Sequence, residues 1–262
     1  AARCKRKNLP GLMLMLDGEQ AYDRVQFSWL RSVMMAMRFP DSFIKLVSLL
    51  YVAPTAKMKV NGHLSDSFSL AQGIRQGAAS SCPLYLIALQ PLLAMIEASD
   101  AIRGVEMPGP NGRGLAELRH TSYADDVACF LRGYADLKPL LHIMRTYETA
   151  SGAATNWSKT IGLRLGTLRA PADTAGLDRI IPFQMHGLSW LDFDDSAIAS
   201  RYLGVYFGSE DRVSTIWRTA ICAKMTRRLT ALRTALPPRT WEGRNLALKN
   251  LVFGKAVFYI MN

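Results

Sequence analysis

The sequence predicts an α+β fold, in which antiparallel strands and helices are followed by an all-helical C-terminal part. Short apolar runs bounded by turn residues, such as Asn61-Gly62, are typical of β-hairpins. Longer stretches carry apolar residues at helical spacing. Hydrophobic residues make up 49% of the 262 residues and charged residues 20%. This composition forms a core and excludes disorder as the main state.

The predicted strands are short, and their boundaries carry polar residues. The first is a nearly all-apolar run that ends at Asp17, which indicates a buried strand. Asn61-Gly62 is the strongest short-range signal for a hairpin turn. Asp125 and Asp126 stand at the tip of a second predicted hairpin. The predicted strands are residues 12–16, 56–60, 64–70, 120–124, 127–131, 161–165 and 201–207.

The predicted helices change in character along the chain. Pro40 and Pro237 each break a helical pattern. Residues 108–114 form a Pro/Gly loop, and residues 167–200 are only weakly patterned. We expect a domain boundary near residue 210, with mixed α and β structure over 1–210 and helices over 211–262. The predicted helices are residues 25–37, 43–51, 83–98, 137–150, 217–236 and 241–262.

The charge is concentrated at the two ends of the chain. The formal net charge is +11. Residues 1–7 carry +4, residues 8–211 carry −2, and residues 212–262 carry +9. A basic segment beside an acidic centre suits a protein that grips a polyanion with one part and performs metal chemistry with another. The alternative is a solvated helix face that only keeps the chain soluble.

Cysteine usage and hydropathy exclude several protein classes. The four cysteines lie far apart without a CxxC pair, which argues against a zinc module or a disulfide scaffold and for an intracellular setting. The longest apolar run, residues 83–96, is shorter than the roughly 18 residues of a membrane span. We therefore expect no membrane partner. The N-terminus also lacks a signal-peptide pattern. The cysteines are Cys4, Cys82, Cys129 and Cys222.

Three acidic residues carry the candidate chemistry. Asp125 and Asp126 are adjacent at a turn, and like charges 4 Å apart repel by about 1 kcal/mol even in bulk water. A divalent cation such as Mg²⁺, which prefers oxygen ligands, would remove this cost. Asp17, at a strand end, could complete a two-metal site for phosphoryl transfer. The alternative is that Asp125-Asp126 is only a polar turn.

The surroundings of these acids resemble a known family. Tyr123-Ala124-Asp125-Asp126, flanked by apolar strands, resembles the YxDD box of reverse transcriptases. Further stretches resemble other motifs of this family, in family order across about residues 12–210. The tail after residue 217 resembles the thumb of the non-LTR, LINE-type branch. The further stretches are residues 16–25, 73–77, 89–92, 151–160 and 201–205.

The resemblance implies a polymerase palm, which is an antiparallel sheet with helices on one face and the Asp125 hairpin at its centre. Residues 1–210 would be this palm with remnants of the fingers, and residues 211–262 a partial helical thumb. The implied activity is RNA-directed DNA synthesis, in which deoxynucleotides are added to a primer 3′-OH by a two-metal mechanism. The implied cofactor is a pair of Mg²⁺ ions, with Mn²⁺ as a substitute.

The resemblance also implies partners and a location. The partners are an RNA template, a DNA primer, deoxynucleoside triphosphates, and the rest of a retrotransposon polyprotein, including upstream fingers and an endonuclease. The implied location is the nucleus, where target-primed synthesis would occur.

The resemblance also assigns roles to residues near the acids. Asp17 and Asp125 match the main metal ligands, Asp126 matches the third acid, and the Gly18 carbonyl would face the second metal. Tyr22 matches the steric gate whose ring occupies the place of a ribose 2′-OH. The alternative for Tyr22 is plain core packing.

Further roles fall on the loops and the tail. Gln76 and Gly77 match the loop that contacts the nucleotide and template. Lys159 matches a lysine that donates a proton to the leaving pyrophosphate, or it is simply an exposed lysine. The implied primer-binding residues are Tyr202, Leu203 and Gly204, which could equally be an ordinary strand pair. The implied nucleic-acid contacts of the tail are Arg218, Lys224, Arg227, Arg228 and Arg233.

The sequence departs from the family at several positions and leaves other functions open. The family usually has a bulky residue at Gly18 and lysine at Gln20, and residues 78–82 lack the usual CPLSP pattern. One alternative is therefore a catalytically inactive remnant that only binds nucleic acid. Another alternative function is that of a palm-type nucleotide cyclase. This function would not explain Arg75-Gln76-Gly77 or the basic tail.

Overall fold

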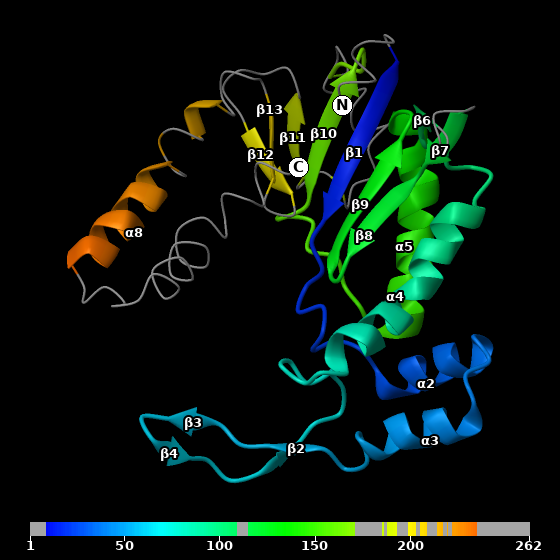
Figure 1. Ribbon diagram of the computed structural model, residues 1–262. Coiled ribbons are helices and arrows are strands. Elements are labelled where there is room, and N and C mark those ends of the chain that lie inside the picture. The colour runs from blue at the N-terminus through cyan, green and yellow to red at the C-terminus, as the bar shows by residue number, and fades with distance from the viewer. Residues whose placement is uncertain are drawn as a thin grey trace. The chain divides into compact units, whose positions relative to one another are not determined.

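The computed structural model (Figure 1) describes part of the chain in detail. The described residues are 9–108, 115–170, 185, 188–192, 199–202, 205–208, 214–216, 219 and 222–234. Contacts divide the chain into two compact units, Ala1–Trp190 and Leu191–Asn262. The hairpin of residues 199–208 therefore belongs to the second unit, although we drew the expected boundary near residue 210. The assignment of palm and thumb to these parts stays a prediction.

Within the described residues, the first unit is built on a five-stranded sheet in the order β11-β10-β1-β9-β8. β1 pairs antiparallel with both β9 and β10, and β8 pairs antiparallel with β9. The predicted α+β class is confirmed. The predicted central position of the Asp125 hairpin is wrong, because β10 and β11 extend the sheet beyond β1 and leave β8 at the edge. The strands are β1 (Pro10–Leu16), β8 (His120–Tyr123), β9 (Asp126–Leu131), β10 (Ile161–Gly166) and β11 (Ser189–Asp192).

β1 is buried on both of its faces. Its alternate residues Leu12 and Leu14 have no exposed surface and belong to the core beneath the helices. Met13 and Met15 alternate to the opposite face and are also buried. Burial on both faces explains why the strand is a continuous apolar run instead of an alternating one.

α4 and α5 lie beside one face of this sheet, and α2 packs against both of them (Figure 1). The helices are α2 (Phe27–Ala36), α4 (Ser81–Ala98) and α5 (Leu137–Ser151), and the short 3-10 helix η2 (Tyr134–Asp136) precedes α5. The Ala88 carbonyl of α4 accepts hydrogen bonds from the Trp29 indole N–H of α2 at 3.0 Å and from the Tyr147 hydroxyl of α5 at 3.3 Å. These bonds tie the three helices at one point and satisfy two polar groups of large aromatic side chains.

α4 is long and apolar enough to cross a membrane by length and composition, with 18 residues at a mean hydropathy of 1.4. Eight of its residues, including Leu84, Leu89 and Ile96, are buried inside the first unit. The core helix of a globular domain has the same apolar character, because it is covered on most sides.

A helix and several short ribbons complete the first unit. α3 (Asp41–Leu49) follows α2. In the predicted hairpin, Asn61 and Gly62 have φ angles of +49° and +87°, as in the type I′ turn that Asn-Gly favours. The expected Pro/Gly loop is flanked by an antiparallel hairpin that the sequence did not predict. The ribbons pair β2 (Thr55–Ala56) with β5 (Phe68–Ser69), β3 (Lys59–Val60) with β4 (His63–Leu64), and β6 (Val105–Pro108) with β7 (Leu115–Leu118).

The described part of the second unit holds a hairpin and a helix. β12 (Ala199–Tyr202) and β13 (Val205–Gly208) pair antiparallel, as the alternative of a strand pair at residues 202–204 predicts, whereas periodicity indicates one strand over residues 201–207. β12 ends at Tyr202 and β13 begins at Val205, a division that periodicity alone does not reveal. α8 (Ala223–Thr234) lies within the helix predicted for residues 217–236. The helix predicted for residues 241–262 lies outside the described residues.

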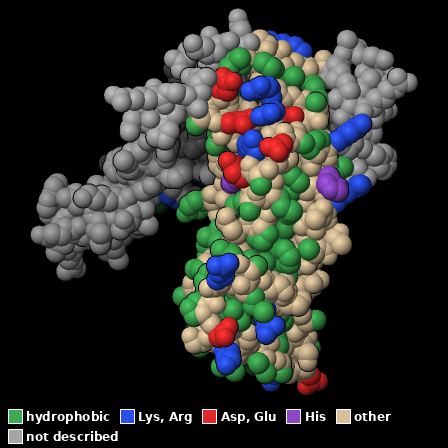
Figure 2. Space-filling model, turned by 90° about the vertical axis from the view of Figure 1, so that its right-hand side faces the viewer, with side chains coloured by type: hydrophobic (Ala, Val, Ile, Leu, Met, Phe, Trp, Pro, Cys, Tyr) green, Lys and Arg blue, Asp and Glu red, His purple; other side chains and the backbone are tan. Residues whose placement is uncertain are grey.

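On the face shown in Figure 2, acidic and basic side chains are interspersed most densely near the upper end and recur near the lower end, with hydrophobic side chains between them. The ion pairs of the first unit include Arg119 with Glu117 at 3.1 Å and Arg132 with Glu106 at 3.3 Å. Charges of opposite sign therefore neutralise each other along the β6–β7 hairpin and the strands that follow it.

Candidate active site

The strand register brings the three predicted acids to one end of the sheet. Leu16, the last residue of β1, is paired with Val127 of β9. Asp17 follows β1 directly, so continuing this antiparallel register by one residue sets it opposite Asp126. Asp125 lies beside Asp126 in the turn between β8 and β9. Residues 108 positions apart in the sequence are thus neighbours at one sheet end.

The turn between β8 and β9 is tight and strained. Tyr123 pairs with Asp126, so only Ala124 and Asp125 lie between the strands. Ala124 has a φ of +54°, a left-handed conformation that costs a residue with a Cβ on the order of 1 kcal/mol. Tyr123 is 71% exposed. The turn therefore presents Asp125 to solvent at the end of a rigid hairpin.

The carboxylates act on one another electrostatically. Partial burial, and then the nearby negative charges of Asp125 and Asp17, raise the pKa of Asp126. A hard divalent cation would relieve this repulsion, and carboxylate oxygens are suitable ligands for it. Among the described residues, no three His, Cys, Asp or Glu side chains are grouped closely enough to hold one metal ion. The donor chemistry fits a divalent cation, but the ligand group is not assembled.

The segment after β1 is bound on one side to residues 151–160. The Asn156 N–H donates to the Asp17 carbonyl at 2.8 Å, and the Asp17 N–H donates to the Thr160 hydroxyl at 3.2 Å. Gly18 forms an antiparallel bridge with Thr155. These bonds join two of the predicted motifs and fix the backbone on both sides of the Asp17 side chain.

Lys159 lies in a turn that Asn156 organises. The Asn156 carbonyl accepts from the N–H groups of Lys159 and Thr160 at 3.2 and 3.0 Å, and its side-chain oxygen accepts from the Ser158 hydroxyl at 2.7 Å. The Lys159 side chain is exposed. The structure thus holds the backbone of Lys159 close to the Asp17 segment and leaves its side chain in solvent.

The segment after β1 is bound on its other side to the loop of residues 73–77. The Ile74 N–H donates to the Tyr22 carbonyl at 2.8 Å. The Gln76 side-chain amide donates to the Asp23 carboxylate at 3.4 Å. Ile74 is fully buried, whereas Gln76 is exposed. The loop that the resemblance assigns to nucleotide contacts is therefore bound to the backbone of Tyr22 and to the side chain of Asp23.

Two glycines of this loop have different structural roles. Gly73 has a φ of +102°, and a Cβ there would lie 2.9 Å from the Asp23 carbonyl oxygen. Gly77 has a φ of +85°, but a Cβ there would meet no atom within 4 Å. Gly73 thus permits a close backbone approach, and Gly77 permits a turn on the exposed side.

Tyr22 stacks on Tyr85 of α4, with ring centroids 4.5 Å apart and an interplanar angle of 23°. Burial, then interaction with the Cys82 side chain, and then the charge of Asp125 raise the pKa of Tyr22. Tyr22 and Asp125 therefore share one electrostatic environment. Sequence reasoning missed Tyr85. It noted Cys82 as one of the four cysteines and as a departure from the family pattern, and assigned it no role in the site.

The amino-acid sequence matches the reverse transcriptase (RNA-dependent DNA polymerase) family over residues 2–207. The chain belongs to the reverse transcriptase family. A relative is the Transposon TX1 uncharacterized 149 kDa protein of Xenopus laevis, which is 30% identical over 207 residues. These residues are 79% of this chain and 14% of that protein, so the chain spans only a small part of its relative.

Two solved structures of telomerase from Candida tropicalis are also similar to this reverse transcriptase domain. The apo enzyme truncated from its C-terminal domain has a TM-score of 0.44 and 16% identity. The match covers 66% of this chain and 34% of the telomerase chain. The complex with a TWJ fragment of telomeric RNA has a TM-score of 0.45 and 15% identity. The match covers 97% of this chain and 40% of the telomerase chain. The family assignment rests on the sequence match.

The predicted primer-binding and tail residues of this reverse transcriptase domain belong to the second unit. The backbone of Tyr202 ends β12 and pairs with Val205, whereas Leu203 and Gly204 lie outside the described residues. α8 carries the described basic residues of the tail: Lys224, Arg227 and Arg228 have exposed side chains, Arg233 lies near the end of the helix, and Arg218 lies outside the described residues.

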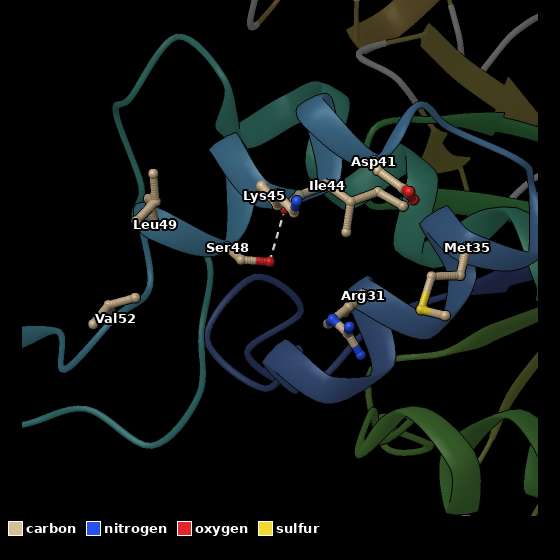
Figure 3. A pocket seen from close by; sticks show the side chains of 8 residues that line it. All are labelled: Arg31, Met35, Asp41, Ile44, Lys45, Ser48, Leu49 and Val52. Atoms are coloured by element: carbon tan, nitrogen blue, oxygen red, sulfur yellow. Dashed lines mark hydrogen bonds between the residues drawn. The ribbon is translucent and has the colours of Figure 1, made fainter.

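A cavity of 620 Å³ lies between α2 and α3 (Figure 3). Sequence reasoning singled out none of its lining residues. In this region Leu49 and Val52 are 69% and 67% exposed, so the cavity is an open hollow with an apolar rim. It is separate from the predicted site residues. The lining residues are Arg31, Met35, Asp41, Ile44, Lys45, Ser48, Leu49 and Val52.

Proposed function

We propose that this chain is the RNA-directed DNA polymerase core of a retrotransposon-encoded polypeptide, which adds deoxynucleotides to a primer 3′-OH along an RNA template. Membership of the reverse transcriptase family and the similarity to a transposon protein support this function. The observation that carries the proposal is the convergence of Asp17, Asp125 and Asp126 at one sheet end.

The proposed metal ligands are the three carboxylates and the Gly18 carbonyl. Like-charge repulsion at Asp126 supports a cation at this end of the sheet. Two Mg²⁺ ions, or Mn²⁺ in their place, would stabilise the attacking and leaving oxygens of an in-line displacement. The strain at Ala124 supports a functional turn, because strained backbone gathers where geometry must be held for a purpose.

The other site residues would handle the nucleotide and primer. The Tyr22 ring would exclude a ribose 2′-OH, and Gln76 with Gly77 would contact the nucleotide and template. Lys159, exposed and tethered beside the Asp17 segment, would donate its Nζ proton to the leaving pyrophosphate. Residues 202–204 would orient the primer end.

Primer extension on poly(rA)/oligo(dT), with the chain in its native flanking sequence, tests this function. The wild type should extend the primer in Mg²⁺ or Mn²⁺ buffer, and Asp125→Asn should not. Asp66→Asn is a matched control, because Asp66 is an exposed carboxylate in the loop between β4 and β5. Extension by Asp125→Asn in Mg²⁺ buffer would overturn the assignment of the acids.

The second candidate function is nucleic-acid binding by a catalytically inactive remnant. One observation favours it: residues 78–82 lack the family's usual CPLSP pattern. In that case the wild type would bind an RNA–DNA hybrid without extending it. For either function we propose a nuclear location, because non-LTR elements start synthesis on chromosomal DNA, and imaging of a tagged chain in cells would test it.

A further inference from the structure

Tyr22 is held from three directions. Its carbonyl accepts the Ile74 N–H at 2.8 Å, so its backbone is fixed by the loop of residues 73–77. Its ring stacks on Tyr85 at 4.5 Å. Its hydroxyl interacts electrostatically with the Cys82 side chain. Both side-chain partners lie in the first two turns of α4, three residues apart and therefore on neighbouring positions of one helix face.

The start of α4 is itself a rigid platform. Tyr85 is only 7% exposed and belongs to the hydrophobic core. Ser81 is 5% exposed, and its hydroxyl donates to the Arg75 carbonyl. This bond ties the first turn of α4 to the same loop that holds the Tyr22 backbone. The ring and the backbone of Tyr22 are therefore both held by the start of α4 and the loop that is bound to it.

We propose that Tyr85 and Cys82 are positioning residues that hold the Tyr22 ring in place and thereby set the discrimination between deoxyribonucleotides and ribonucleotides. The inference rests on the proposed function, in which Tyr22 excludes the 2′-OH. It extends that function to two residues that would contact neither nucleotide nor metal.

A steric gate rejects a ribonucleotide only while its side chain cannot move aside. Tyr22 is half-buried, so the open side of its ring allows rotation once the stacking partner is lost. An offset-stacked aromatic pair contributes enough beyond simple burial to change an equilibrium about two- to tenfold. Discrimination should therefore fall by about two- to tenfold when Tyr85 no longer supports the ring. Loss of the Cys82 side chain should have a smaller effect in the same direction, because a thiol interacts only weakly with a hydroxyl.

The experiment measures kcat/KM for dGTP and GTP on an RNA template with a DNA primer, using the chain in its native flanking sequence. The variants are Tyr85→Leu, Tyr85→Phe and Cys82→Ala. Phe43→Leu is the matched control, because Phe43 of α3 stacks on Phe39 at 5.3 Å with the same interplanar angle of 23°. Tyr85→Leu should raise kcat/KM for GTP relative to dGTP, chiefly through a lower KM for GTP. Tyr85→Phe should keep the wild-type ratio.

A purely structural role for Tyr85 would lower both kcat/KM values together and leave their ratio unchanged. That result, in a wild-type background that incorporates dGTP, would overturn the inference while the proposed function stands. If Tyr85→Leu does not fold, Cys82→Ala decides, because Cys82 is exposed and its truncation leaves the core intact. An unchanged ratio in Cys82→Ala would then refute the inference. Absence of dGTP incorporation by the wild type would instead refute the proposed function, and the inference with it.

Discussion

Replacing Gly73 by alanine should destabilise the first unit far more than the same change at Gly77. Both glycines have positive φ angles, +102° and +85°, so each substitution strains the backbone by about 1–2 kcal/mol. Only at Gly73 does the new Cβ meet another group, the Asp23 carbonyl oxygen at 2.9 Å. This oxygen belongs to backbone that cannot rotate away, and such overpacking costs a further 1–3 kcal/mol or so.

The combined effect at Gly73 is about 3 kcal/mol, which corresponds to a fall in Tm of roughly 6–12 °C for a unit of this size. Thermal unfolding of Gly73→Ala, Gly77→Ala and the wild type measures the difference. Primer extension should fall in parallel for Gly73→Ala, because the displaced segment carries Tyr22. Equal Tm values for the two variants would refute the claim that residues 73–77 are packed closely against the Asp23 backbone.

Three further predictions concern the acids and the tail. Asp125→Asn should abolish nucleotide incorporation and leave hybrid affinity within a few-fold in a filter-binding assay, because a lost metal ligand removes several kcal/mol of transition-state stabilisation. Asp126→Asn should stabilise the metal-free chain at pH 7. The pKa of Asp126 is raised in the folded state, so its ionisation lowers stability as pH rises through the interval above its usual value of 3.8. The gain in the free energy of unfolding should stay below about 1 kcal/mol, because the site is exposed, and it should vanish below pH 3.8. The gain should also shrink when Mg²⁺ is added. Urea unfolding measures each of these differences. Changing Lys224 and Arg227 on α8 to Gln should flatten the slope of log Kd against log salt for an RNA–DNA hybrid by about one to two units, and superimposable slopes would remove α8 from the nucleic-acid contact.

Local patterns predicted much of the fold because they depend on few residues. The continuous apolar run before Asp17 predicts a strand buried on both faces, and β1 is such a strand. Asn61-Gly62 fixes a turn through its own backbone preferences. The family motifs predicted which distant segments meet, because the segments around Asp17, Ile74 and Asn156 are joined by hydrogen bonds.

Features that depend on long-range packing were not predictable. Strand order is one example, because nothing in the Asp125 hairpin indicates that β10 and β11 add on the far side of β1. β11 was missed because residues 167–200 lack alternation, although Trp190 packs over Gly162, where a Cβ would lie 2.5 Å from the indole ring. The Tyr22–Tyr85 stack is another example, because the two residues are far apart in the sequence and no sequence pattern predicts their contact.

The departures of residues 78–82 from the family pattern affect the site less than their number suggests. The residue that this chain retains there, Ser81, makes the buried hydrogen bond to the Arg75 carbonyl that joins α4 to the loop of residues 73–77. The residue that replaces the family's proline, Cys82, is exposed and interacts electrostatically with Tyr22. The anchoring of α4 to this loop thus depends on the Ser81 hydroxyl, whereas the neighbouring position 82 can change without breaking this bond. We therefore expect substitutions at Ser81 to abolish nucleotide incorporation by displacing both Tyr22 and the loop, and substitutions at Cys82 to alter only which sugar is accepted.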